Sequence, residues 1–136
     1  MRIALINENS QAGKNEVILR ALCSAAKPYG HEIFNYGMHN PEDEHYLTYV
    51  QNGILAAVLL NSGAVDFVVT GCGTGEGAML ALNAFPGVQC GLVTDPSDAF
   101  LFTQINNGNA VSLPYAKGFG WGGERLIWNI FLKNFS

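Results

Sequence analysis

A glycine-rich segment in the middle of the chain, Gly71-Cys72-Gly73-Thr74-Gly75-Glu76-Gly77, combines a thiol and a carboxylate with four glycines at alternate positions. Alternate glycines let the backbone approach a ligand closely and point several N–H groups at it. A strand-like apolar run precedes the segment and a helical pattern follows it, so a helix N-terminus would also stabilise an anion there. The segment therefore predicts an anion-binding loop with two ionisable groups.

The two ionisable groups of this loop suggest proton transfer. A thiol beside a helix N-terminus ionises more readily than usual and can act as base or nucleophile, which sets Cys72 apart from Cys23 and Cys90. Glu76, in the first helical turn, either complements the helix dipole or acts as a general base. Three widely spaced cysteines, without a C-x-x-C pair or a histidine at a metal-ligand offset, predict neither a disulfide framework nor a metal site.

The loop sequence is also compatible with two other interpretations. Gly73-x-Gly75-x-x-Ala78, with Asp95 further on, fits a degenerate dinucleotide fingerprint, but it follows the third predicted strand rather than the first. A tight strand-to-helix turn without a ligand is the other, although four glycines exceed what one turn needs. No cofactor is expected.

Composition limits the class of protein. A chain of 136 residues predicts a single domain over residues 1–136, and 49% hydrophobic against 13% charged residues favours a packed core and self-association. A net charge of -4 without basic clusters argues against nucleic-acid binding. The apolar run at residues 1–6 is too short for a signal peptide or a membrane span, so a cytoplasmic location is expected.

Short apolar runs alternate with helical patterns, which predicts βαβ units and a parallel sheet covered on both faces. We predict strands at residues 2–7, 32–36, 66–70, 89–93 and 110–113, and helices at residues 14–27, 46–60, 76–84, 97–104 and 124–135. In such sheets ligands bind outside the carboxyl ends of the strands. The loops to consider are therefore residues 7–13, 37–45, 71–77, 94–97 and 114–123.

Motifs along the chain bear a family resemblance. The loop Gly71–Gly77, with Asn83, Pro86-Gly87, Thr94-Asp95-Pro96 and Asn106-Asn107-Gly108-Asn109 after it, resembles the ribose-5-phosphate isomerase B and galactose-6-phosphate isomerase family. The resemblance implies a three-layer α/β/α Rossmann-like fold with a five-stranded parallel sheet. It also implies a homodimer or dimer of dimers with shared active sites, and aldose–ketose isomerisation of a sugar phosphate without metal or cofactor.

The resemblance also implies roles for single residues. Cys72 matches the family's usual proton carrier, and Glu76 matches the glutamate of members that lack the cysteine. Backbone N–H groups of the glycine loop, with Thr74 and Asn106, would stabilise the enediolate. The glycines concerned are Gly71, Gly73, Gly75 and Gly77.

Several positions depart from the family pattern. Glu8-Asn9-Ser10 stands where the family has Asp-His, and Ile105 replaces a histidine associated with ring opening. Glu8, Asn9, Tyr46 and His45 are predicted around the sugar. Lys117, Arg125 and Lys14 are the cations available for the phosphate. The aromatic, glycine-rich stretch 117–124 predicts either a sugar-binding wall or a subunit contact. These departures leave a non-catalytic sugar-phosphate-binding or regulatory relative as the alternative function.

Overall fold

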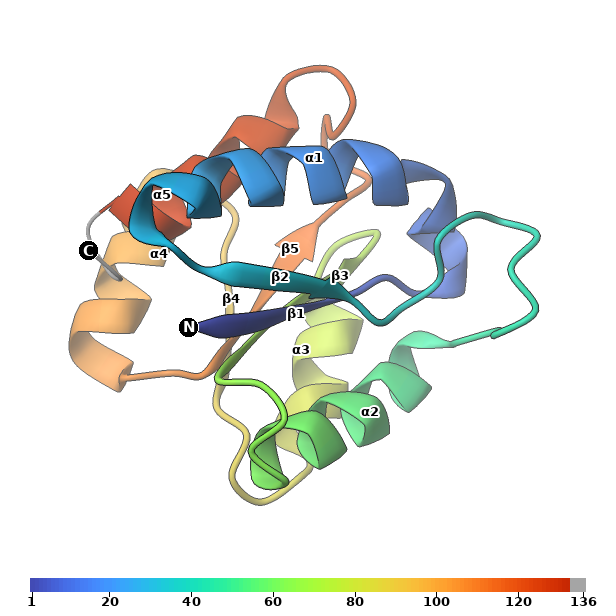
Figure 1. Cartoon of the computed structure of the whole chain (residues 1–136), viewed down its shortest axis with the longest axis horizontal. Helices are drawn as coiled ribbons and strands as arrows, with labels where there is room; N and C mark the ends of the chain where they lie inside the picture. The colour runs from blue at the N-terminus through green and yellow to red at the C-terminus, as the bar shows by residue number, and fades with distance from the viewer. Residues whose placement is uncertain (133–136) are drawn as a thin grey trace.

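Five strands form one parallel sheet in the computed structural model, which describes residues 1–132 apart from the side chains of residues 100, 103, 104, 131 and 132. The strands are β1 (Arg2–Ile6), β2 (Glu32–Asn35), β3 (Phe67–Cys72), β4 (Cys90–Leu92) and β5 (Ala110–Pro114). Their spatial order is β2-β1-β3-β5-β4, and every pairing is parallel (Figure 1). The predicted five-stranded parallel sheet is confirmed.

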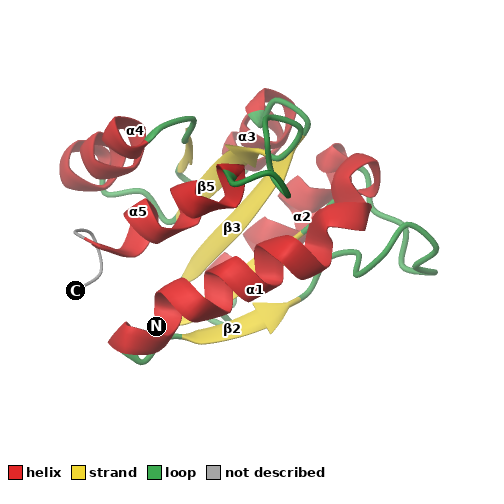
Figure 2. Ribbon diagram, turned by 90° about the horizontal axis from the view of Figure 1, so that it is seen from above, coloured by secondary structure: helices red, strands yellow, loops and turns green. Residues whose placement is uncertain are grey.

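Helices cover both faces of this sheet, as Figure 2 shows. One layer holds α1 (Asn15–Ala26), α4 (Pro96–Leu101) and α5 (Leu126–Leu132), and the other holds α2 (Tyr49–Asn61) and α3 (Glu76–Asn83). Side chains of β3 alternate between the two cores, with Phe67 and Val69 under α1 and Val68 under α2. Burial on both faces is why the central strands β1, β3 and β5 are nearly continuous apolar runs, whereas β2 at the edge alternates between exposed and half-buried residues.

Short helical turns join these elements. Three are 3₁₀ turns: η1 (Asn9–Lys14), η2 (Lys27–Tyr29) and η4 (Gly123–Arg125). The fourth, η3 (Phe102–Asn106), is a π-helical turn that continues α4, so the helix predicted over residues 97–104 changes geometry after Leu101. The last three residues of the helix predicted over 124–135 lie outside the described residues.

Among the element boundaries that differ from prediction, two have clear reasons. Helix α2 begins at Tyr49 rather than residue 46, because Thr48 accepts from the Gln51 N–H (3.3 Å) while the Gln51 side chain accepts from the Thr48 N–H (2.9 Å). Strand β3 extends two residues beyond the predicted 66–70, because Gly71 and Cys72 pair with β5. The cysteine of the loop is therefore the last residue of a central strand.

The connections place a crevice at the carboxyl ends of β1 and β3. The chain leaves β1 for α1 on one face of the sheet and leaves β3 for α3 on the other, and β1 and β3 are neighbours. Such a switch point is where open α/β sheets bind ligands. Residues 8–14 and 73–75 therefore form its two walls. Among residues 1–132, no helix has the length and apolar character needed to span a membrane.

Candidate active site

Cys72 closes β3 at this crevice. It lies opposite Pro114 of β5, its carbonyl accepts from the Tyr115 N–H (2.9 Å), and its exposed fraction is 8%. The structure thus fixes the thiol-bearing residue on a strand and shields it from most water. Thr74 and Glu76 follow in an exposed turn, where the Thr74 hydroxyl accepts from the Glu76 N–H (3.2 Å) and supports the start of α3.

The glycine loop is held from the side of β5. The Gly75 carbonyl accepts from the Ser112 hydroxyl (2.6 Å), and the Gly73 carbonyl accepts from the Ala116 N–H (3.1 Å). In a trans peptide the N–H points opposite to the C=O, so the N–H groups of Thr74 and Glu76 face away from β5. The Thr74 N–H therefore points toward the side of the loop that faces away from β5, and no bond from it to the described residues is seen.

Two glycines of the loop are required by its geometry. Gly75 has φ +86°, a left-handed conformation that other residues rarely adopt. A side chain on Gly71 would come 2.7 Å from the Tyr115 ring. Tyr115 itself is fully buried, and burial, with Glu8 and Cys72 nearby, raises the pKa of its hydroxyl well above the usual value.

The first loop is built around Glu8. Its carboxylate, 1% exposed, accepts from the Ser10 N–H (3.0 Å), the Ser10 hydroxyl (2.8 Å) and the Gln11 N–H (2.9 Å). It therefore shapes the loop and faces inward. Asn9, by contrast, donates to the Tyr46 hydroxyl (2.5 Å), so these two predicted sugar-site residues lie together at the rim.

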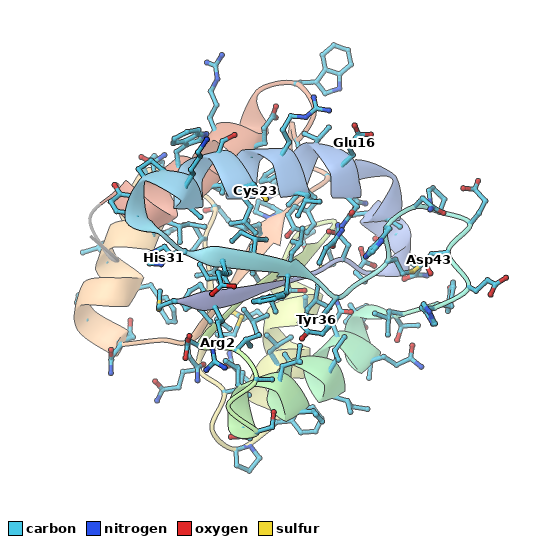
Figure 3. The ribbon with its side chains drawn as sticks, viewed as in Figure 1. Arg2, Glu16, Cys23, His31, Tyr36 and Asp43 are labelled. Carbon is cyan, nitrogen blue, oxygen red and sulfur yellow. The ribbon has the colours of Figure 1, made fainter. Side chains whose placement is uncertain are left out.

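His45 belongs to the exposed loop after β2. Its N–H and that of His39 donate to the Asp43 carboxylate (both 2.9 Å), and these backbone donors, His39 first, lower the pKa of Asp43 (Figure 3). The imidazole of His45 itself is exposed. Within residues 1–132, no hydrogen bond or ion pair links that ring to the glycine loop.

The predicted cations divide into two groups. Lys14 donates from Nζ to the Tyr115 carbonyl (2.6 Å), which ties the first loop to the end of β5. Lys117 and Arg125 share one opening at the carboxyl edge, a cleft of about 290 Å³ that Thr94 and Asp95 also line. Pro114, the strand partner of Cys72, forms one wall of it. This cleft therefore suits the anionic end of a ligand.

The stretch after Lys117 is an ordered loop. The Glu124 carboxylate accepts from the N–H groups of Gly120 and Gly122 (both 3.0 Å), and its own backbone N–H, then these two, lower its pKa. Trp121 at the tip of this loop is 92% exposed. The loop presents an aromatic ring to solvent rather than to a wall of this chain.

Asn106 lies at the opposite edge of the sheet, near the amino ends of β4 and β5. It ends η3, four residues before β5 begins, and shares a small surface hollow with Asn83 and Cys90 at the amino end of β4. Cys72 lies at the carboxyl end of the sheet, opposite the last residue of β5, and the two ends of that five-residue strand are about 13 Å apart. One chain therefore does not bring Asn106 to its own glycine loop, so the predicted joint role of the two requires a site shared between subunits. Ile105, beside it, is 72% exposed.

Sequence reasoning missed three residues that support the site. Ser112 and Tyr115 were hidden in an apolar strand and its end, where their types carry no signal. Gln11 lies in the loop of residues 7–13, which is one of the predicted ligand loops. Its Nε2 would lie 4.0 Å from a β-carbon placed on Gly73. Among the described residues, no group of three or more His, Cys, Asp and Glu side chains could hold a metal ion.

The fold and this site define a small α/β protein with a parallel sheet, a crevice at its topological switch point and a thiol-bearing residue beside that crevice. Comparison with known families is more specific. Residues 3–134 match the model of the Ribose/Galactose Isomerase family, and the chain belongs to that family.

Solved structures agree with this assignment. A ribose-5-phosphate isomerase from Vibrio parahaemolyticus is 58% identical, with a TM-score of 0.93, over 100% of this chain and 64% of that one. A 4-deoxy-L-threo-5-hexosulose-uronate ketol-isomerase, solved with a tartrate, is 62% identical, with a TM-score of 0.91, over 96% and 62%. The chain thus spans less than two thirds of both. A type B ribose 5-phosphate isomerase from Trypanosoma brucei, 23% identical with a TM-score of 0.84 over 99% and 87%, shares the fold.

Proposed function

We propose that this chain is an aldose–ketose isomerase that acts on an anionic sugar through an enediolate. The observation that carries the proposal is Cys72, held at the end of β3 directly before a loop whose Thr74 N–H faces the crevice. Isomerisation needs a base that takes a proton from the carbon beside the carbonyl and returns it to the neighbouring carbon. It also needs donors for the charge that develops on the enediolate oxygens.

Cys72 is the base that we propose, and Glu76 is the alternative. Cys72 is fixed by strand pairing in a nearly buried position, which holds its thiol in one place relative to the reacting carbons. Glu76 is exposed on the first turn of α3. A role for Glu76 in orienting the substrate, with the thiol moving the proton, is consistent with both positions.

The base is tested by following deuterium incorporation at the carbon next to the carbonyl. We expect Cys72→Ala to lose at least a thousandfold in exchange rate and Glu76→Gln to lose much less. Cys23→Ser is the matched control, because this thiol is exposed on α1 (Figure 3) and should change nothing. Full exchange by Cys72→Ala would contradict the assignment and point to Glu76.

The first candidate substrate is a pentose or hexose phosphate. The family and the 58% identical Vibrio structure support it. Lys117 and Arg125, in the cleft beside Pro114, are the groups that we propose for the phosphate. Replacing both by methionine should raise KM for a sugar phosphate at least tenfold and leave kcat within threefold.

The second candidate substrate is an acyclic uronate. A 4-deoxy-5-hexosulose uronate has no hydroxyl on carbon four and a ketone at carbon five, so neither carbon offers the hydroxyl that usually closes a sugar ring. Such a substrate needs no ring-opening group, which suits Ile105 where the family has a histidine. The 62% identical ketol-isomerase supports the same class. The cleft cations would then bind a carboxylate.

One assay separates these candidates. The purified protein is incubated with ribose 5-phosphate, galactose 6-phosphate and the deoxy-hexosulose uronate, and kcat/KM is compared. A preference above a hundredfold identifies the class. Thermal stabilisation by one of them without turnover or exchange would instead select the alternative, a non-catalytic relative that has kept the pocket.

We further propose that the active unit is a homodimer, or a dimer of dimers, with shared sites. An exposed apolar face runs along α2 and α3, where Val50, Ile54 and Leu80 line an apolar groove of about 390 Å³. Gly77 of the glycine loop lies in the same groove, so this face borders the site. A second copy placed here could supply the Asn106 that one chain holds at its far edge. We expect light scattering to show that Ile54→Glu is a monomer. We expect the isomerase assay to show that this monomer is inactive.

A further inference from the structure

Gln11 is anchored by its backbone on both sides. Its N–H donates to Glu8 (2.9 Å), and its carbonyl accepts from the Asn7 side chain (3.4 Å). Asn7 is in turn held by Asn15, which also bonds Asn35 at the end of β2. Hydrogen bonds among the loop after β1, the start of α1 and the end of β2 thus hold the backbone of Gln11 in place.

The Gln11 carboxamide lies against the glycine loop. A methyl group on Gly73 would come 4.0 Å from Gln11 Nε2 and 3.7 Å from the Ala116 side chain. The carboxamide therefore stands across the crevice from the residue that follows Cys72. Its one bond among the described residues is a long one, from Nε2 to the Ser10 hydroxyl (3.4 Å). A second N–H and the amide oxygen are thus available to a ligand.

The first loop otherwise offers little to a substrate. Glu8 faces inward with both oxygens engaged, and Lys14 is bonded to the Tyr115 carbonyl. A carboxamide is uncharged at every working pH and presents a donor and an acceptor side by side, which suits a sugar hydroxyl beside the reacting carbons. It contributes binding and orientation, and it takes no part in proton transfer.

We infer that Gln11 is a specificity-determining residue that binds a substrate hydroxyl next to the carbon pair on which Cys72 acts. This inference rests on the proposed isomerase function. It adds a substrate contact from the loop after β1, in which Glu8 and Asn9 depart from the family pattern.

The test compares Gln11→Leu with wild type for the preferred substrate and for its analogues that lack one hydroxyl. We expect Gln11→Leu to lower kcat/KM at least tenfold for the substrate and to cost less than twofold for one deoxy analogue, because that analogue lacks the bonded hydroxyl. Ser24→Leu, an exposed polar-to-leucine change on α1, is the control and should leave both values unchanged.

Three outcomes are decisive. A kcat/KM of Gln11→Leu within twofold of wild type overturns the inference. An equal loss for the substrate and every deoxy analogue also overturns it, because a merely structural role would give that pattern. If wild type itself neither turns over nor exchanges any substrate, the proposed function fails first, whereas an active wild type with an indifferent Gln11→Leu removes only the inference.

Discussion

The Ser112 hydroxyl, fully buried on β5, donates to the Gly75 carbonyl at 2.6 Å. This bond connects the floor of the sheet to the middle of the glycine loop. It is the one side-chain tie that the described residues make to the Gly73 and Gly75 carbonyls, and it fixes the direction of the peptide that precedes Glu76.

Ser112→Ala should therefore weaken both the fold and the site. Loss of the hydroxyl removes one of the two hydrogen bonds to the Gly75 carbonyl, which still accepts from the Met79 N–H (3.1 Å), and this costs about 0.5–1.5 kcal/mol of unfolding free energy. We expect kcat to fall about tenfold through the loosened loop, with KM less affected. Urea unfolding and steady-state kinetics measure the two effects. Ser62→Ala, which removes a hydroxyl bond at the far end of α2, should change stability slightly and activity not at all; equal effects on activity would refute the role of Ser112.

Gly75→Ala tests the crowding beneath the loop. The backbone of residue 75 has φ +86°, and a β-carbon added there would lie 2.8 Å from the Leu92 side chain. We expect Gly75→Ala to lower the free energy of unfolding by about 2–4 kcal/mol, of which about 1–2 kcal/mol is the cost of the left-handed backbone conformation for alanine. Gly30→Ala isolates the backbone part, since Gly30 has φ +71° with open space around it. Similar losses for the two variants, by thermal unfolding, would show that the loop has room to adjust.

Mixing two inactive variants tests whether sites are shared. If Cys72 and Asn106 act together only across subunits, a dimer of Cys72→Ala with Asn106→Ala contains one intact site. Random exchange of subunits should then restore about a quarter of wild-type activity, because half of the dimers are mixed and each has one site of two. Activity that stays at the sum of the two variants would place both residues in independent roles.

The acid stability of the loop before α4 depends on Asp98. The Thr94 hydroxyl bonds its carboxylate (2.7 Å) and, with backbone donors, lowers its pKa below the ordinary value. A lowered folded-state pKa contributes stability above the unfolded value of about 3.9, and this is lost as pH falls through the folded pKa. Thr94→Val should thus be less stable than wild type near neutral pH, and the difference should shrink below about pH 4. Thr94→Ser keeps the hydroxyl and should behave like wild type; a pH-independent gap would refute the linkage.

The sequence predicts the sheet and the loop well because their signals are local. Apolar runs, helix periodicity and alternate glycines indicate β3, α3 and the turn between them without knowledge of their neighbours. The sequence also carries a signal for the true start of α2, since Thr48 and Gln51 have capping-box spacing, although the predicted helix begins at Tyr46.

Other features depend on packing that one sequence does not reveal. Glu8 is a polar residue in a ligand loop, and only the folded chain shows its carboxylate turned inward to cap η1. Asn106 is different, because chain order alone indicates its place: it precedes β5, and the amino ends of parallel strands lie at the edge away from Cys72. Family resemblance drew the two residues together where the topology of one chain separates them.

Trp121, 92% exposed on a loop held by Glu124, is also a built-in optical probe. The chain has two tryptophans, so Trp128→Phe leaves the indole of Trp121 as the single one. Indole emission moves to shorter wavelength when water around the ring is replaced. The emission of this variant therefore reports directly whether a sugar or a second subunit covers the ring, and titrations of substrate and of protein concentration separate the two.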